Sequence, residues 1–192
     1  ERAENMTKGY FALVLHAHLP YVRHPEYEHF LEEKWFYEAI TETYLPLLWT
    51  FEKLAEDGVD FRVTINLSPT LLSMFNDELL RQRYVRHLES LLELANKEVG
   101  RTTHEPEFHG TALMYRDLFS RAHYLFTEKY HRNLVEAFKQ LQDNGKLEIM
   151  TSGATHGYFP LLGVQREVIN AQVAVFVRSG EQNPCPVCDG LL

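Results

Sequence analysis

The chain has 192 residues, of which 45% are hydrophobic, and its formal net charge is -8. This acidic balance argues against a protein that binds nucleic acid or an anionic membrane by electrostatic attraction. No apolar segment reaches the roughly 20 residues that span a bilayer, and residues 1–8 do not have the form of a secretion signal. We therefore expect a single cytoplasmic domain that acts on small molecules or neutral polymers.

An apolar run that starts at Phe11 predicts the first strand, which ends in two histidines, His16 and His18. Pro20 prevents this strand from continuing as a central member of a sheet. Because side chains alternate along a strand, both imidazoles should face one site at the carboxyl end, where binding and catalytic groups collect. They could line a substrate pocket, ligate a metal with a third group, or serve as structural histidines.

Residues 22–33 form a predicted loop over the end of this strand, where binding residues often lie. Its glutamates are predicted to form a solvated cluster of charges: Glu26, Glu28, Glu32 and Glu33. Residues 34–55 then show the spacing of a helix, which Pro46 should kink or divide and Gly58 should end.

Residues 60–66 alternate apolar and polar side chains and predict a second strand. Ser68, followed by a proline, suits the start of a helix over 69–95 in which the serine is the cap. Residues 96–110 carry several charges and no apolar periodicity, so we expect a loop there. A long helical region is predicted over 111–143.

The third predicted strand covers residues 147–152 and leads into a second loop of interest. Gly157 would permit a tight turn, His156 offers a hydrogen-bond donor and acceptor, and Tyr158 offers a flat surface that stacks on sugar rings. The alternative is a turn that anchors the next helix, predicted over 165–178. Parallel strands would bring both histidine loops to one edge.

Strands that alternate with helices are typical of an α/β fold with parallel pairing and right-handed crossovers. Three strands make an incomplete sheet, and so much helix would leave apolar surface open. We predict that residues 9–178 are the front part of a larger β/α barrel, preceded by a disordered N-terminus over 1–8. Residues 179–192, with Cys185 and Cys188, are predicted to be an unrelated, disordered tail without structural zinc.

Glycoside chemistry requires two carboxylates that flank the scissile bond. Asp60 and Glu148 lie at the wrong end of the predicted sheet, because both come at or before the start of a strand. The residues alone therefore predict no catalytic carboxylate pair.

Three segments together resemble the N-terminal part of glycoside hydrolase family 57, closest to its 1,4-α-glucan branching enzymes: residues 11–21, 37–47 and 148–162. The resemblance extends from Gly9 to about Val177 and implies part of a seven-stranded β/α barrel. It also implies retaining transglycosylation of an α-1,4-glucan such as amylose, with a glutamate nucleophile and an aspartate acid/base. No metal or other cofactor is implied.

On this resemblance, His16 and His18 match the first family motif and line the donor-side subsite, and His156 matches the second, near the same sugar. Tyr158 is predicted as a further substrate-binding residue. The family nucleophile belongs to a tryptophan-containing segment on the next strand, whereas this chain has two tryptophans, both upstream. Neither catalytic carboxylate is present, so we predict that this chain does not catalyse branching.

Two other functions remain open. A metal-dependent hydrolase similar to polysaccharide deacetylases also uses strand-end histidines in a barrel, and it requires a bound metal. A non-catalytic module that binds glucan or a partner through a half-open sheet would instead expose an apolar face.

Overall fold

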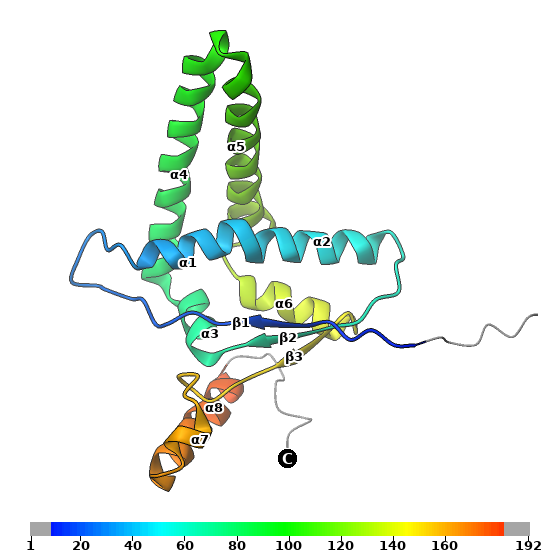
Figure 1. Cartoon of the computed structure of the whole chain (residues 1–192), viewed down its shortest axis with the longest axis vertical. Helices are drawn as coiled ribbons and strands as arrows, with labels where there is room; N and C mark the ends of the chain where they lie inside the picture. The colour runs from blue at the N-terminus through cyan, green and yellow to red at the C-terminus, as the bar shows by residue number, and fades with distance from the viewer. Residues whose placement is uncertain (1–8, 183–192) are drawn as a thin grey trace, which may run out of the picture.

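A computed structural model describes residues 9–182, which are built around a parallel sheet of three strands in the order β1-β2-β3 (Figure 1). The strands are β1 (Val14–Ala17), β2 (Val63–Leu67) and β3 (Leu147–Met150). Leu15, Ile65 and Ile149 align across the sheet, and so do His16, Asn66 and Met150. The predicted α/β class with parallel strands is confirmed.

Helices connect the strands and follow them. They are α1 (Glu33–Ala39), the π-helical turn Ile40–Tyr44, α2 (Leu45–Glu56), α3 (Pro69–Asn76), α4 (Glu78–Arg101), the 3-10 turn Thr102–His104, α5 (Pro106–Tyr124), the π-helical turn Leu125–Lys129, α6 (Leu134–Asp143), α7 (Phe159–Leu162) and α8 (Arg166–Gln182). In Figure 1, α1, α2 and α6 lie over one face of the sheet, and α4 and α5 form a hairpin that stands away from it.

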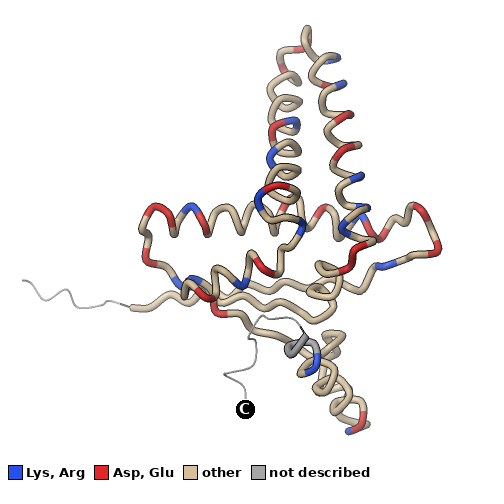
Figure 2. Tube along the Cα trace, turned by 180° about the vertical axis from the view of Figure 1, so that it is seen from behind, with Lys and Arg blue, Asp and Glu red and all other residues tan. Residues whose placement is uncertain are grey.

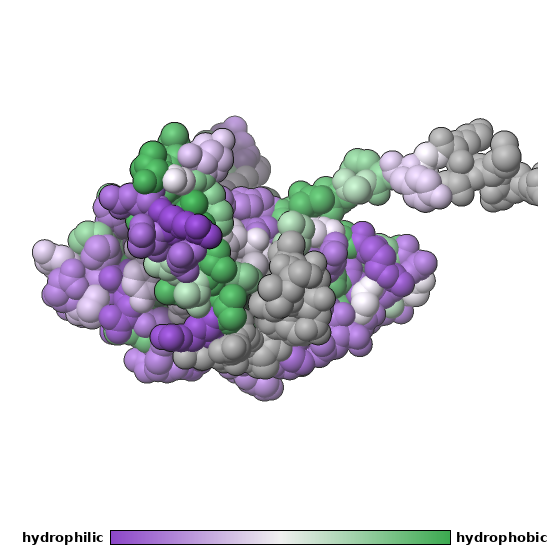
Figure 3. Space-filling view, turned by 90° about the horizontal axis from the view of Figure 1, so that it is seen from below, coloured by the Kyte–Doolittle hydropathy of each residue, from purple (hydrophilic) through white to green (hydrophobic). Residues whose placement is uncertain are grey.

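The two faces of the sheet differ in what covers them. Ile65 and Ile149 are buried in the core under the helices. On the other face Val14 is 60% exposed and Met150 is 40% exposed. Figure 3 shows apolar groups on this lower side and along the segment that leads into β1. The predicted open apolar surface is therefore confirmed for this face.

Pro46 does not divide the helix predicted over 34–55, because α1, the π-helical turn and α2 follow one another without a gap. It lies in the first turn of α2 and has no N–H to donate to the preceding turn. The backbone there is a π-helix, in which the N–H of Leu45 donates to the carbonyl of Ile40. Gly58, with a φ of 72°, follows the end of α2, in agreement with the prediction.

The loop predicted over 96–110 is wrong, because α4 continues to Arg101 and α5 begins at Pro106. The hairpin of α4 and α5 projects from the body, and its outer part buries small side chains such as Ala95 and Ala112. Most of its other residues face solvent, so they show no apolar periodicity. Ion pairs at helical spacing lie along it: Lys97 with Glu93, and Arg101 with Glu98 and Glu105.

The helices predicted over 69–95 and 111–143 are each broken. Asp77 has an extended backbone, separates α3 from α4 and caps α4 with its side chain. His131 and Arg132 are left-handed, with φ of 49° and 62°, so the second helix cannot continue into α6. Polar residues at both breaks are compatible with either a helix or a turn, so the pattern alone does not reveal these breaks.

Charged residues of both signs lie mostly along the helices and their connections, and few lie on the strands (Figure 2). Within residues 9–182, no helix combines the length and the apolar character needed to cross a membrane. Helix α8 extends to Gln182, so four residues assigned above to the tail are helical. The predictions for residues 1–8 and for Cys185 and Cys188 lie outside the described residues.

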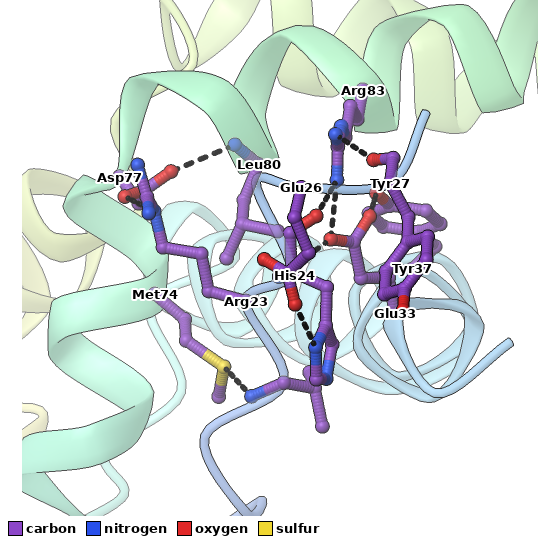
Figure 4. A network of polar contacts seen from close by, with 11 residues as sticks. Arg23, His24, Glu26, Tyr27, Glu33, Tyr37, Met74, Asp77, Leu80 and Arg83 are labelled. Carbon is purple, nitrogen blue, oxygen red and sulfur yellow. Dashed lines mark hydrogen bonds and ion pairs between the residues drawn. The ribbon is translucent and has the colours of Figure 1, made fainter. Parts of the chain in front are cut away.

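Glu33 is not part of a solvated cluster, which corrects the prediction for this residue. Its side chain is buried, and Oε1 lies 2.5 Å from Nη1 of buried Arg83. Arg83 also donates to the carbonyls of His24 and Tyr27, which ties the loop before α1 to α4 (Figure 4). The Tyr37 hydroxyl donates to Glu33, and burial together with this carboxylate raises the pKa of Tyr37.

The Glu33→Gln variant should lower the free energy of unfolding by about 3–5 kcal/mol, because it leaves the buried charge of Arg83 without its partner. Glu93→Gln is the control, since Glu93 pairs with Lys97 at an exposed site and its loss should cost less than about 1 kcal/mol. Urea unfolding followed by circular dichroism measures both. An equal loss of unfolding free energy in the two variants would contradict a dominant role for the buried pair of Glu33 and Arg83.

Candidate functional site

Three histidine rings meet at the carboxyl edge of the sheet. His16 lies in β1, His18 follows that strand, and His156 lies in the loop after β3. Nε2 of His16 is 2.8 Å from Nε2 of His156, and the ring centroids of His18 and His156 are 4.3 Å apart. Parallel pairing thus brings the two histidine loops together, as the order of strands and helices predicted.

The contact between His16 and His156 restricts their protonation. A hydrogen bond between two ring nitrogens needs one N–H donor and one lone pair. At least one of these two rings is therefore neutral while the contact exists. The site can present both donors and acceptors to a ligand.

The first turn of α3 holds the ring of His18. Its Nδ1 is 2.9 Å from Oγ of Ser68, which is fully buried and caps α3 by accepting the N–H of Leu71. Oγ1 of Thr70 is 3.1 Å from Oγ of Ser68 and donates to the carbonyl of Leu19. Two hydroxyl groups therefore fix one side of this imidazole.

The surroundings of His18 favour its neutral form. Burial lowers the pKa of His18 below its ordinary value of 6.5, and the nearby His156 and His16 lower it further. Among the described residues, no hydrogen bond or ion pair of these three rings involves a carboxylate. Nothing in this part of the chain thus favours a charged His18.

The loop that carries His156 is bent at that residue. His156 has a φ of 59°, which is uncommon for a residue other than glycine. Three hydrogen bonds fasten the loop to Gln172 of α8. Its side chain accepts from the backbone N–H of Thr155 at 2.9 Å and donates to the Thr155 hydroxyl at 2.8 Å, and its carbonyl accepts the N–H of Ala154 at 3.3 Å. These contacts hold the backbone in the conformation that directs His156 to His16.

The expected role of Gly157 is corrected. The left-handed residue of this turn is His156, and Gly157 does not have a positive φ. A Cβ at position 157 would instead lie 2.6 Å from Cδ1 of Leu162, so the missing side chain makes room for α7.

Tyr158 is separate from the histidine cluster. Its side chain is 68% exposed, and it makes none of the described contacts with the three rings. Its exposed aromatic ring is available to a ligand, and its stacking role stays a prediction.

Two of the carboxylates considered in the sequence lie toward the opposite edge. Glu148 aligns with Thr64 and accepts its hydroxyl proton, and this pair is level with Val14 at the start of β1. Asp60 precedes β2 and pairs with Arg62. Within residues 9–182, no three His, Cys, Asp or Glu side chains are arranged to hold a metal ion.

The sequence-based prediction missed three residues that shape the site. Ser68 was expected only to cap a helix, and Thr70 and Gln172 were not expected to contribute. Ser68 and Thr70 directly follow β2, so the same rule that placed the histidines at strand ends could have found them. Gln172 lies within a helix and gives no such signal.

Comparison with known proteins identifies close relatives. The family model described as glycosyl hydrolase family 57 matches residues 12–176. A curated relative, the 1,4-alpha-glucan branching enzyme TK1436 of Thermococcus kodakarensis, is 37% identical over 177 residues, which are 92% of this chain and 25% of that protein. This chain therefore spans a quarter of the length of that relative.

Two solved structures have a similar fold. The crystal structure of the alpha-amylase AmyC from Thermotoga maritima has a TM-score of 0.84 and 48% identity, over 90% of this chain and 32% of that one. The GH57-type branching enzyme from Pyrococcus horikoshii has a TM-score of 0.84 and 34% identity, over 92% of this chain and 33% of that one.

The lowered pKa of His18 predicts a loss of stability in acid. The unfolded chain takes up the histidine proton near pH 6.5, above the pKa of the folded state, so stability falls as the pH decreases from 6.5 toward the folded pKa. His18→Gln should reduce this fall between about pH 7.5 and pH 5.5, as measured by urea unfolding. Ser73→Ala is the control. Ser73 is an exposed residue of α3, so this variant should lose stability in acid as the wild type does. If the stability of His18→Gln falls with decreasing pH as much as that of the wild type, the prediction is contradicted.

Proposed function

The chain belongs to glycosyl hydrolase family 57, and we propose that it supplies the sugar-binding histidine wall of a domain that acts on α-1,4-glucan. His16 and His18 line the donor-side subsite in this proposal, and His156 contacts the same sugar. Tyr158 offers its exposed ring for stacking. Relatives named as branching enzymes and as an alpha-amylase support α-glucan as the substrate class.

One observation carries this proposal, the meeting of three imidazoles without a carboxylate. A neutral imidazole has one donor and one acceptor, and a sugar hydroxyl has the same combination. Neutral His18 and the hydrogen-bonded pair of His16 and His156 therefore suit a neutral polyol. Hydrogen bonds that strengthen as charge develops at the anomeric carbon would stabilise the transition state.

The reaction proposed for the whole domain is a branching transfer, in which a glucan segment moves to a 6-hydroxyl group during synthesis of a glycogen-type polymer in the cytoplasm. It requires a nucleophile and an acid/base, both carboxylic acids. The described contacts of the three histidines include no carboxylate. We propose that residues 9–178 form the front part of a β/α barrel and that this chain alone binds glucan without cleaving it.

Hydrolysis of α-glucan is the second candidate, and a specific observation favours it. The relative named as an alpha-amylase is 48% identical, against 34% for the branching enzyme of Pyrococcus horikoshii. The products separate the two reactions, because hydrolysis creates new reducing ends and a branching transfer does not. Amylose incubated with the longest product of this gene would be assayed for reducing ends and for α-1,6 linkages.

The remaining alternatives have less support. A deacetylase-like hydrolase requires a metal, and the described residues do not offer three ligands for one. A purely non-catalytic module agrees with the open face of the sheet, where Val14 is exposed. The glucan-binding experiment below tests this function as well.

Maltoheptaose should bind to this chain at the histidine cluster and shift the NMR signals of His16, His18 and His156. Cellohexaose, whose β-linkages give a different shape, should not. His16→Ala and His156→Asn should each weaken binding about five- to ten-fold, the effect of losing one hydrogen bond. Asparagine is chosen at position 156 because it tolerates a left-handed backbone.

Ser73→Ala is again the control, and it should bind maltoheptaose as the wild type does. Isothermal calorimetry gives the affinities. Equal binding of both sugars, or no effect of either histidine variant, would contradict the proposed site. Cleavage of amylose by this chain alone would contradict its proposed inactivity.

A further inference from the structure

Five polar contacts join His18, Ser68 and Thr70 to one another and to the backbone. The N–H of Leu71 donates to Oγ of Ser68 at 3.4 Å, and Nδ1 of His18 is 2.9 Å from the same oxygen. Oγ of Ser68 is 3.1 Å from Oγ1 of Thr70, and the Thr70 hydroxyl is 3.2 Å from the carbonyl oxygen of Leu19. Nδ1 of His18 is also 3.4 Å from Oγ1 of Thr70, and a ring proton directed at Ser68 can be shared with that oxygen. Each of the four other contacts needs one proton between its two heavy atoms.

Only one arrangement supplies four protons. The carbonyl of Leu19 can only accept, so the Thr70 proton points to it, and Thr70 must accept from Ser68. Ser68 has then used its one proton and must accept from both Leu71 and His18. The ring proton of neutral His18 therefore lies on Nδ1.

The other tautomer leaves one contact unfilled. With the ring proton on Nε2, Leu71, Ser68 and Thr70 bring three protons to four contacts. In one contact, two lone pairs would then face each other with no proton between them. Ser68 is fully buried, so water does not compensate for the missing bond.

We propose that Ser68 and Thr70 are positioning residues that keep the ring proton of His18 on Nδ1 and leave Nε2 as an acceptor for a sugar hydroxyl. This inference rests on the proposed glucan site. Nε2 of His18 has no hydrogen-bond partner among the described residues, and its ring lies beside that of His156. A hydroxyl bound between the rings would donate to His18.

The test uses the full chain labelled with ¹⁵N-histidine. Long-range ¹H–¹⁵N spectra distinguish a protonated ring nitrogen from one with a lone pair, and the His18→Gln variant identifies the His18 signals. The wild type should carry its proton on Nδ1. Thr70→Val has the same shape but removes the acceptor of the Ser68 proton, which should turn to Nδ1 of His18 and move the ring proton to Nε2.

Ser73→Ala lies on the same helix, faces solvent and should keep the wild-type tautomer. Thr70→Val should also bind maltoheptaose several-fold more weakly while keeping the circular dichroism of the wild type. A wild-type His18 protonated on Nε2, or a Thr70→Val variant with an unchanged tautomer, would overturn the proposal. If the tautomers behave as expected and maltoheptaose does not bind, the proposed function fails and the tautomer assignment stands.

Discussion

The buried position of Ser68 is the constraint on which the candidate site depends. Its backbone N–H donates to the carbonyl of Ala17 at 3.1 Å and so joins the ends of β1 and β2. Its side chain starts α3 and contacts His18. Because the residue is inaccessible to water, a lost partner is not replaced by solvent. The sheet edge, the start of a helix and the orientation of one imidazole are therefore coupled through a single residue.

Local patterns predicted the elements whose residues are half in the core and half in solvent. Val63 and Ile65 alternate with polar neighbours, and Ser68 with its following proline marks a helix start. The outer part of the α4–α5 hairpin lacks such a pattern, because Lys97 and its neighbours face solvent there. Breaks such as the left-handed His131 and Arg132 depend on tertiary packing that no short window of sequence contains.

The candidate site likewise has features that the sequence could predict and features that it could not. His16 and His156 are 140 positions apart, and their meeting could be predicted because parallel strands end at one edge. The burial of Glu33 could not, since its partner Arg83 lies 50 positions away and its neighbours in sequence are solvated. The hydroxyl groups behind His18 were missed because a serine and a threonine at a helix start have an adequate local explanation as caps.

The open face of the sheet bears on the strength of this site. Val14 and Met150 are exposed beside His16, so burying this face is favoured by the hydrophobic effect. The same burial would remove water from the imidazoles, which costs free energy unless other polar groups take its place. Sugar hydroxyls would meet both demands, because they would fill the donor and acceptor positions while the sugar ring covered the surface. Covering the site would also make each hydrogen bond stronger by lowering the local dielectric constant. Since burial already lowers the pKa of His18, further burial would deepen its preference for the neutral form that can accept a hydroxyl proton.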